Sequence, residues 1–234
     1  MNAFGFSLIA ALNAALDAAV RDSACTSLVL SGNKRAFSAG FDLGVMGPKG
    51  DADLRAELLL QGAQLTERLY AFPKPLVVAG TGHGLALGAI LLLAGDLRVG
   101  PAAGQKGKFG LNEVAIGMTL PLFGIELARA RCPTATFEES VLRARVYDSV
   151  GAVRAGFLDL LADSPGLDAV VAAAAAEAEK IGAYVRQPAF AQQKLLARAA
   201  TLAIVRGEIR GMEERVAARR AKAAEAGASR PSRL

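Results

Sequence analysis

Three short apolar segments separated by helical patterns limit what this chain can fold into more than any other feature. They cover residues 27–31 (SLVLS), 76–79 (LVVA) and 97–99 (LRV). Short apolar runs that end at turn residues suit strands buried on both faces, as in a parallel sheet. The segments between them, at 53–70 and 85–94, have the apolar spacing or composition of crossover helices. We therefore predict an α/β fold with a parallel sheet.

Helical patterns dominate both ends of the chain. Apolar residues recur every four positions from 7 to 21, behind Ser7 as a possible cap. After Pro121 we expect helices at 122–131, 136–143, 149–155, 164–181 and 188–226, one short strand at 157–161, and a disordered tail at 227–234. Because no long linker interrupts this succession, we divide the chain into a core, residues 1–161, and C-terminal helices with a tail, residues 162–234.

Composition narrows the class of protein. With 234 residues, 53% of them hydrophobic, the chain can bury a substantial core. The apolar run 85–94 is about half the length of a membrane span, and the first residues do not resemble a secretory signal. Cys25 and Cys132 lack the spacing of a metal site or redox pair, so we expect two buried thiols and no metal. Neither a membrane span nor a secreted protein is predicted.

The net charge of +5 comes largely from the last third of the chain. Its cations lack the interleaved aromatic residues that nucleic-acid binding favours, so no nucleic-acid partner is expected. A solvated helix face explains these charges, and the alternative is that some of them meet an anionic ligand.

Two glycine-rich turns carry the chemistry. Residues 35–46 (RAFSAGFDLGVM) follow the first strand, and residues 81–88 (TGHGLALG) follow the second and open a helix. Turns at the carboxyl ends of neighbouring parallel strands can aim two backbone amides at one oxygen. Such paired donors stabilise an oxyanion.

Three segments in order, FSAGFDL, GHGLALGAILLLAGDLRVG and FGLNEVAIGM, resemble the signature segments of the crotonase (enoyl-CoA hydratase/isomerase) superfamily. The similarity continues through SLVLSG and PLFGIELARARC, from Asn2 to about Leu161. The resemblance implies a ββα superhelix with a C-terminal helical trimerisation region, assembled as a homotrimer or hexamer. It also implies acyl-CoA thioester substrates and no separate cofactor, because coenzyme A is part of the substrate. The cationic last third could then meet phosphates of CoA.

The same resemblance assigns roles to residues. The two oxyanion amides fall on Phe41 and Leu87, and Leu87 stands where the family has the middle glycine of a three-glycine run. Residues that line the substrate channel, mainly through their backbone, would be Ala39, Gly40, Asp42, Leu43 and Gly88.

Family hydratases use two glutamates, and this chain keeps one. The first position falls on Ile90, and the second falls on Glu113, which follows Asn112 instead of the usual proline. A single carboxylate opposite an oxyanion hole favours Δ3-Δ2-enoyl-CoA isomerisation in fatty-acid β-oxidation. Apolar Val114, Ile116 and Met118 are expected to raise its pKa. The alternatives are an enoyl-CoA hydratase, with Asn112 holding the water, and a non-catalytic acyl-CoA binder.

Five further features complete the expectations. His83 and Asp96 are interpreted as structural, Asp96 by fixing backbone amides at the start of a strand. The family's first strands normally precede the segment matched by Asn2, so the chain is expected to lack them. The loop 100–108 is longer than usual and could shift Glu113.

The end, Ser232-Arg233-Leu234, is similar to a Ser-Lys-Leu peroxisomal address, which predicts a peroxisomal protein, with a cytoplasmic one as the alternative.

Overall fold

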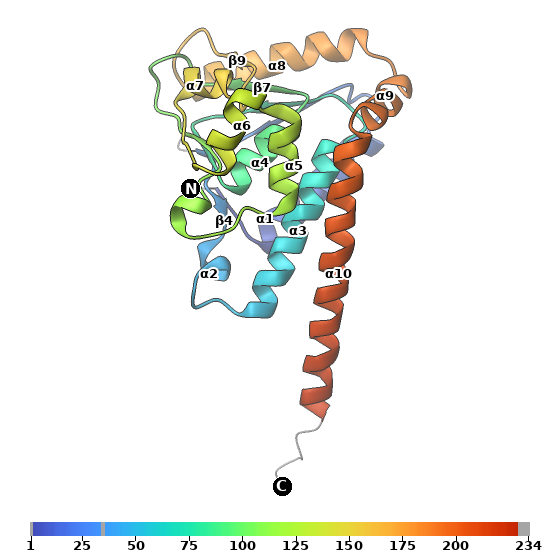
Figure 1. The fold of residues 1–234 in the computed structure, drawn as a ribbon. Coiled ribbons are helices and arrows are strands. Elements are labelled where there is room, and N and C mark those ends of the chain that lie inside the picture. The colour runs from blue at the N-terminus through green and yellow to red at the C-terminus, as the bar shows by residue number, and fades with distance from the viewer. Residues whose placement is uncertain (1, 34–35, 229–234) are drawn as a thin grey trace.

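The computed structural model describes residues 2–33 and 36–228 and has an α/β architecture (Figure 1). Its main sheet is parallel and has the strand order β2-β5-β7-β9. These strands are β2 (Leu28–Ser31), β5 (Leu76–Ala79), β7 (Leu97–Gly100) and β9 (Leu160–Leu161). The predicted parallel sheet is confirmed, and its strands lie close to the apolar segments that indicated them.

A second set of very short parallel strands accompanies the main sheet. Strands β3 (Ala36–Ser38), β6 (His83–Leu85) and β8 (Phe109–Gly110) form it in that order, and β1 (Ala3–Phe4) pairs with β4 (Gly40–Phe41). Strands β2, β5 and β7 precede β3, β6 and β8 respectively, and a helix follows each of these pairs further along the chain, namely α3 (Ala52–Tyr70), α4 (Leu87–Ala94) and α5 (Leu122–Arg131). This repeat is the expected ββα superhelix. The helix predicted from residue 85 starts later, because Leu85 belongs to β6.

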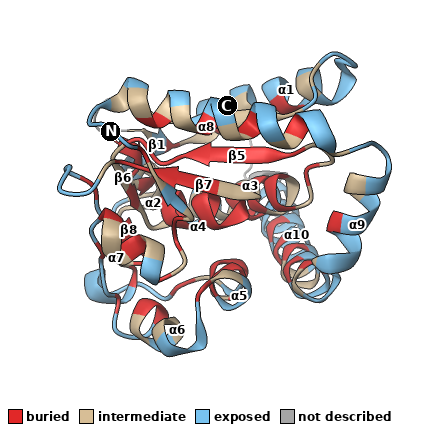
Figure 2. Ribbon diagram, turned by 90° about the horizontal axis from the view of Figure 1, so that it is seen from above, coloured by how far each residue is buried: buried red, intermediate tan, exposed pale blue. Residues whose placement is uncertain are grey.

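The two central strands of the main sheet, β5 and β7, are largely buried, as Figure 2 shows. Along β5, Leu76 and Val78 join the larger core cluster, which includes α4. Val77 and Ala79 point the other way and pack with the inner face of α8 (Leu167–Tyr184). Side chains of successive strand residues alternate between faces, so an unbroken apolar run is what a sheet covered by helices on both sides requires.

The remaining elements cover the edges of this core. They are α1 (Phe6–Arg21), α2 (Leu43–Met46), η1 (Val114–Ile116), α6 (Thr134–Val141), α7 (Ser149–Arg154), α9 (Ala189–Ala197) and α10 (Ala199–Ala228). Several predicted details are wrong. Gly5, not Ser7, precedes the first helical residue of α1. The helix predicted at 188–226 is broken at Arg198, and α10 continues through the start of the predicted tail. Cys25 is only half-buried.

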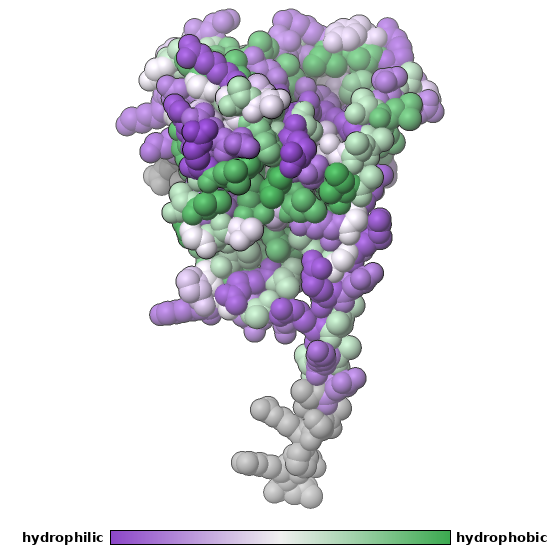
Figure 3. All heavy atoms as spheres, in the orientation of Figure 1, coloured by the Kyte–Doolittle hydropathy of each residue, from purple (hydrophilic) through white to green (hydrophobic). Residues whose placement is uncertain are grey.

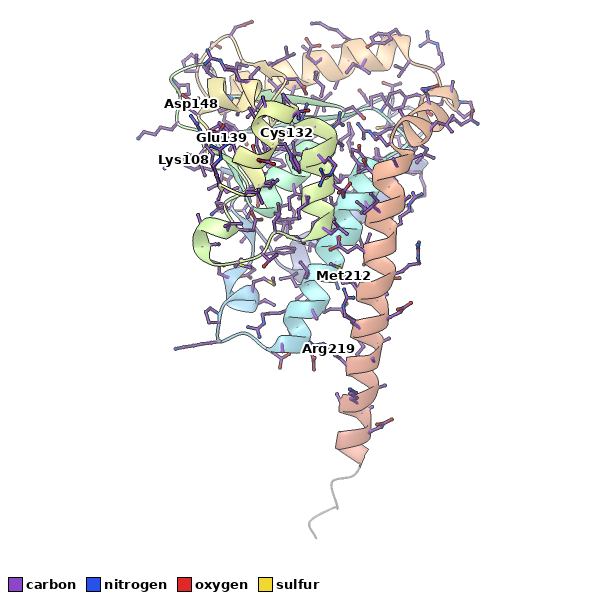
Figure 4. The ribbon with its side chains drawn as sticks, in the orientation of Figure 1. Lys108, Cys132, Glu139, Asp148, Met212 and Arg219 are labelled. Atoms are coloured by element: carbon purple, nitrogen blue, oxygen red, sulfur yellow. The ribbon has the colours of Figure 1, made fainter. Side chains whose placement is uncertain are left out.

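Helix α10 leaves the body of the molecule after crossing α3 and α5 (Figure 1). Met212 and Arg219 lie one below the other on it, beside α3 (Figure 4). Three of its arginines pair with acids of α3, at 2.7 Å for Arg206–Glu67, 3.0 Å for Arg219–Asp53 and 2.6 Å for Arg220–Glu57. The cationic face predicted to be solvated is therefore partly an ion-paired contact.

Asp96 joins the main sheet to the C-terminal helices. Its Oδ2 accepts hydrogen bonds from the backbone N–H of Leu76 at 2.7 Å, the contact expected from the sequence, and from Lys194 Nζ at 2.7 Å. Its Oδ1 accepts a bond from Arg198 Nη2 at 2.8 Å. The Asp96 side chain is 15% exposed and that of Lys194 is 4% exposed, so this ion pair is largely removed from water.

No helix within residues 2–33 and 36–228 is both long and apolar enough to cross a membrane. In that same part of the chain, no group of three or more His, Cys, Asp or Glu side chains could hold a metal ion. Ser232, Arg233 and Leu234 lie outside the described residues, so the peroxisomal address stays a prediction. The boundary between residues 161 and 162 also stays a prediction.

We predict that Asp96→Asn lowers the free energy of unfolding by about 3–5 kcal/mol, because it leaves two buried cations without their carboxylate. Asp53→Asn removes one partner of an exposed ion pair on α3 and is expected to cost at most about 1 kcal/mol. Urea unfolding of both variants measures the difference. Equal losses would contradict the anchoring role of Asp96.

Candidate active site

Three turns converge at the carboxyl edge of the short parallel strands. In the register of β3, β6 and β8, Ser38 pairs with Gly84 and Gly84 with Phe109. Beyond the strand ends, the Ala86 N–H donates to the Gly110 carbonyl at 3.2 Å. Carboxyl ends of parallel strands share one edge. The turns that carry Phe41, Leu87 and Glu113 therefore leave the same edge.

Two backbone amides at this edge have no role in the local secondary structure. Leu87 is the first residue of α4, so its N–H has no partner within the helix. In β4, the Asp42 N–H donates to the Phe4 carbonyl at 3.1 Å. Because successive amides along an extended strand point to opposite sides, the Phe41 N–H points away from β1. The geometry therefore suits the predicted pair of oxyanion donors.

The turns that carry these amides touch each other. A Cβ atom built on Gly40, which has a φ of +99°, would lie 2.9 Å from Ala86 Cβ and 3.4 Å from the Leu87 nitrogen. Ser38 supports the first turn, because its buried hydroxyl donates to the Asn2 carbonyl at 2.7 Å and accepts from the Gly40 N–H at 3.0 Å. Gly88 fits closely against Ser38, whose carbonyl oxygen would lie 2.5 Å from an added Cβ.

Leu87 is accommodated by a glycine in the neighbouring helix. A Cβ built on Gly62 of α3 would lie 2.3 Å from Phe41 Cζ and 3.6 Å from Leu87 Cδ2, so both side chains pack over this glycine. The backbone strain falls on Ala86, which has a φ of 51°. A non-glycine residue in that region costs about 1–3 kcal/mol and is typical of functional turns. The predicted tolerance for a side chain at Leu87 thus depends on Gly62 and Ala86.

The residues predicted to line the substrate channel differ in their solvent exposure and in which of their atoms are free to contact a ligand. Ala39 is half-buried, and the side chain of Leu43 is 72% exposed. Asp42 caps α2 by accepting a hydrogen bond from the Gly44 N–H at 2.8 Å. The amides of Gly40 and Asp42 are already bonded within the protein, so contacts to a ligand would come from other atoms of these residues. Gly88 is buried against Ser38 and lines no open surface.

Glu113 is the buried acid of the site. It precedes η1, is 6% exposed, and its Oε2 has no hydrogen-bond partner among residues 2–33 and 36–228. Burial raises the pKa of this carboxyl to about 7, partly opposed by its own backbone amide. Such a group both accepts and donates a proton near neutral pH.

The predicted direction of this pKa shift and its cause, desolvation, are confirmed. The apolar neighbours Val114, Ile116 and Met118 are themselves 48%, 57% and 40% exposed, so they stay partly open to solvent. The turn at η1 lies within an apolar region that Figure 3 shows across the middle of the face seen in Figure 1. Glu113 itself is 6% exposed, and this burial is what desolvates its carboxyl group.

The remaining predicted residues lie either beside Glu113 or away from the site. The Oδ1 atom of Asn112 is buried without a hydrogen-bond partner in the described part of the chain, next to Glu113. Ile90 is 1% exposed and packs against Gly124, whose added Cβ would lie 2.7 Å from Ile90 Cδ1. His83 begins β6, at the opposite end of that strand from Leu87. This location agrees with the structural interpretation of His83.

Comparison with known proteins defines the family. A sequence model described as enoyl-CoA hydratase/isomerase matches residues 1–213, so the chain belongs to the enoyl-CoA hydratase/isomerase family. It is 40% identical over 117 residues, 50% of this chain and 44% of the relative, to a 2,3-dehydroadipyl-CoA hydratase from Escherichia coli K12. The chain spans about half the length of this relative and of three other curated relatives, at 44–56%.

Solved structures match over more of the chain. Enoyl-CoA hydratase EchA3 from Mycobacterium ulcerans Agy99 is 37% identical, with a TM-score of 0.84 over 92% of this chain and 90% of that one. A Mycobacterium tuberculosis protein, named an enoyl-CoA isomerase in one structure and a probable enoyl-CoA hydratase EchA3 in another, is also 37% identical, and the first of these structures has a TM-score of 0.82 over 91% and 89% of the two chains. The fold is therefore that of the crotonase superfamily, and structures of similar identity carry both activities in their names.

We predict that stability falls as pH rises from about 4.5 to 7, because folded Glu113 keeps a proton that the unfolded chain has released. At about 1.4 kcal/mol per pKa unit, the loss is roughly 3 kcal/mol, and it levels off above the folded pKa. Urea unfolding across this pH range, for wild type and Glu113→Gln, isolates the contribution. Parallel pH curves for the two proteins would show that Glu113 titrates normally.

We also predict that Gly40→Ala destabilises the protein more than Gly104→Ala. Both glycines have positive φ, +99° and +78°, and each substitution should cost about 1–2 kcal/mol in backbone strain. Only at Gly40 would the new methyl group meet a neighbour, Ala86, whereas nothing lies within 4 Å at Gly104. Overpacking adds about 1–3 kcal/mol there. Equal free energies of unfolding would mean that the two turns are not in tight contact.

Proposed function

We propose that this protein is a Δ3-Δ2-enoyl-CoA isomerase. The observation that carries the proposal is one buried, unpartnered carboxylate, Glu113, at the same sheet edge as the amides of Phe41 and Leu87. The position at which family hydratases hold a second glutamate is Ile90, which is 1% exposed and packed in the core. Ile90 and Glu113 therefore cannot hold a water between two carboxylates, as the two glutamates of family hydratases do.

One carboxylate can complete the reaction by moving a single proton. Ionised Glu113 removes a proton from C2 of a 3-enoyl-CoA, and the electron pair moves into the thioester carbonyl to give a dienolate. The N–H groups of Phe41 and Leu87 stabilise the developing oxyanion. Protonated Glu113 then returns the proton to C4, the electrons move back, and the double bond lies between C2 and C3. A pKa of about 7 serves both steps.

Hydration is the second candidate function, and one specific observation favours it. The buried Oδ1 of Asn112 has no hydrogen-bond partner among the described residues and adjoins Glu113, so it could accept a hydrogen bond from a water. Names of similar proteins also include hydratases, as for the Escherichia coli relative. The closed position at Ile90 makes hydration the weaker candidate.

The proposal includes a cellular setting. The substrate would be an acyl-CoA thioester of fatty-acid β-oxidation, coenzyme A would enter with the substrate, and the protein would assemble as a homotrimer or hexamer. The end sequence Ser232-Arg233-Leu234 supports a peroxisomal location, with the cytoplasm as the alternative.

We predict that the purified protein converts a 3-enoyl-CoA to the conjugated 2-enoyl-CoA and that Glu113→Gln lowers kcat about 10²–10⁴-fold. The matched control is Glu126→Gln, because Glu126 is similarly buried, at 7% against 6%, but lies on α5 in an ion pair with Arg129. This control should keep activity. Absorbance of the conjugated thioester follows the reaction.

Two other outcomes would contradict the isomerase assignment. If conjugation is instead lost from a 2-enoyl-CoA, and Asn112→Ala abolishes that loss, the protein is a hydratase. If folded wild-type protein binds acyl-CoA but changes neither substrate, it is a non-catalytic acyl-CoA binder.

A further inference from the structure

A cationic cluster lies where α9 meets the body of the molecule. We call it the α9 junction and define it by Asp96, Arg131, Lys194 and Arg198. Asp96 lies between α4 and β7, Arg131 ends α5, Lys194 is in α9, and Arg198 separates α9 from α10. None of these four residues takes part in the proposed catalysis.

The α9 junction has more positive charge than its acid can neutralise. Asp96 binds Lys194 at 2.7 Å and Arg198 at 2.8 Å, which leaves Arg131 without a carboxylate partner in the described part of the chain. The nearby Arg98 brings its own acid, Asp159, at 2.6 Å, so this pair adds no net charge. Three cations therefore share one carboxylate.

Helix ends offset part of the excess. Arg131 donates to the carbonyls of Leu93 at 3.1 Å and Gly95 at 2.6 Å, and Arg198 donates to that of Tyr70 at 2.6 Å. These carbonyls close α4 and α3, and each helix C-terminus is equivalent to about half a negative charge. Among the side chains of the α9 junction, the cations still outnumber the one carboxylate, Asp96.

The excess charge borders an open cavity. A cavity of about 550 Å³ is lined by all four residues of the α9 junction together with Thr201 and Gln193. Burial, and then repulsion from neighbouring cations, lowers the pKa of Arg131 to about 10. Burial also lowers the pKa of Lys194 to about 8, despite its bond to Asp96. Lys194 uses one N–H on Asp96, so the others can reach an anion.

We propose that the cavity at the α9 junction binds a tetrahedral oxyanion, namely inorganic phosphate or the phosphate group of a larger molecule. Lys194 and Arg131 would supply charge-assisted hydrogen bonds, which are the strongest that a protein offers to phosphate. The hydroxyl of Thr201 and the side-chain amide of Gln193 line the same cavity and can donate as well. This site is separate from the proposed isomerase function and does not depend on it.

The test compares two neighbouring glutamines of α9. Gln193 lines the cavity and Gln192 does not, and both are exposed, so Gln193→Glu and Gln192→Glu add the same charge to the same helix. Titration calorimetry with inorganic phosphate, against chloride at matched ionic strength, measures binding to the full chain. We expect Gln193→Glu to weaken phosphate binding at least about 10-fold and Gln192→Glu to leave it within about 2-fold.

Further arms make the result decisive. Lys194→Gln, if folded, should also lose phosphate binding. Equal weakening by the two glutamine variants, an equal response to chloride, or no heat with phosphate would overturn the proposal. Competition identifies the source of the phosphate group: displacement by CoA but not by dephospho-CoA assigns the site to the 3′-phosphate of CoA. If neither CoA nor dephospho-CoA displaces the bound phosphate, the site binds the free ion. Either of these two results supports an anion site.

Discussion

Parallel pairing of the short strands β3, β6 and β8 is the constraint on which the rest of the site depends. Because each strand delivers its turn to the same edge, the turns that carry Phe41, Leu87 and Glu113 leave the sheet on one side. The bond from the Ala86 N–H to the Gly110 carbonyl connects two of these turns directly. The larger sheet beneath supplies rigidity, since its central strands β5 and β7 are largely buried.

Patterns of apolar residues predicted the large elements well. The strand at 76–79 and the helix at 122–131 have their predicted bounds, because apolar runs buried on both faces and a proline at a helix start are local signals. The short strands β3, β6 and β8 could not be derived in this way. They are too short to show a period, and Gly84 at the centre of β6 has no side chain to mark a buried face.

The site was only partly predictable for a related reason. The turns at Phe41, Leu87 and Glu113 could be located because their sequences resemble a family. The features that make them work depend on contacts between distant segments: Gly62 receives two side chains, and Ser38 holds the Gly40 turn. Gly62 itself was the one local signal available. A glycine inside a predicted helix, here 53–70, weakens that helix and therefore indicates that close packing requires it.

The position of α10 has a consequence for how the protein is made. Arg206 pairs with Glu67, 139 residues earlier in the chain, and the contact covers a face of α3. At synthesis rates of about 5–20 residues per second, that face waits roughly 7–30 s before its covering helix leaves the ribosome. Gly62 lies on α3 as well. The newly made core is thus exposed to chaperones or to aggregation for most of the chain's translation, until the last helix docks.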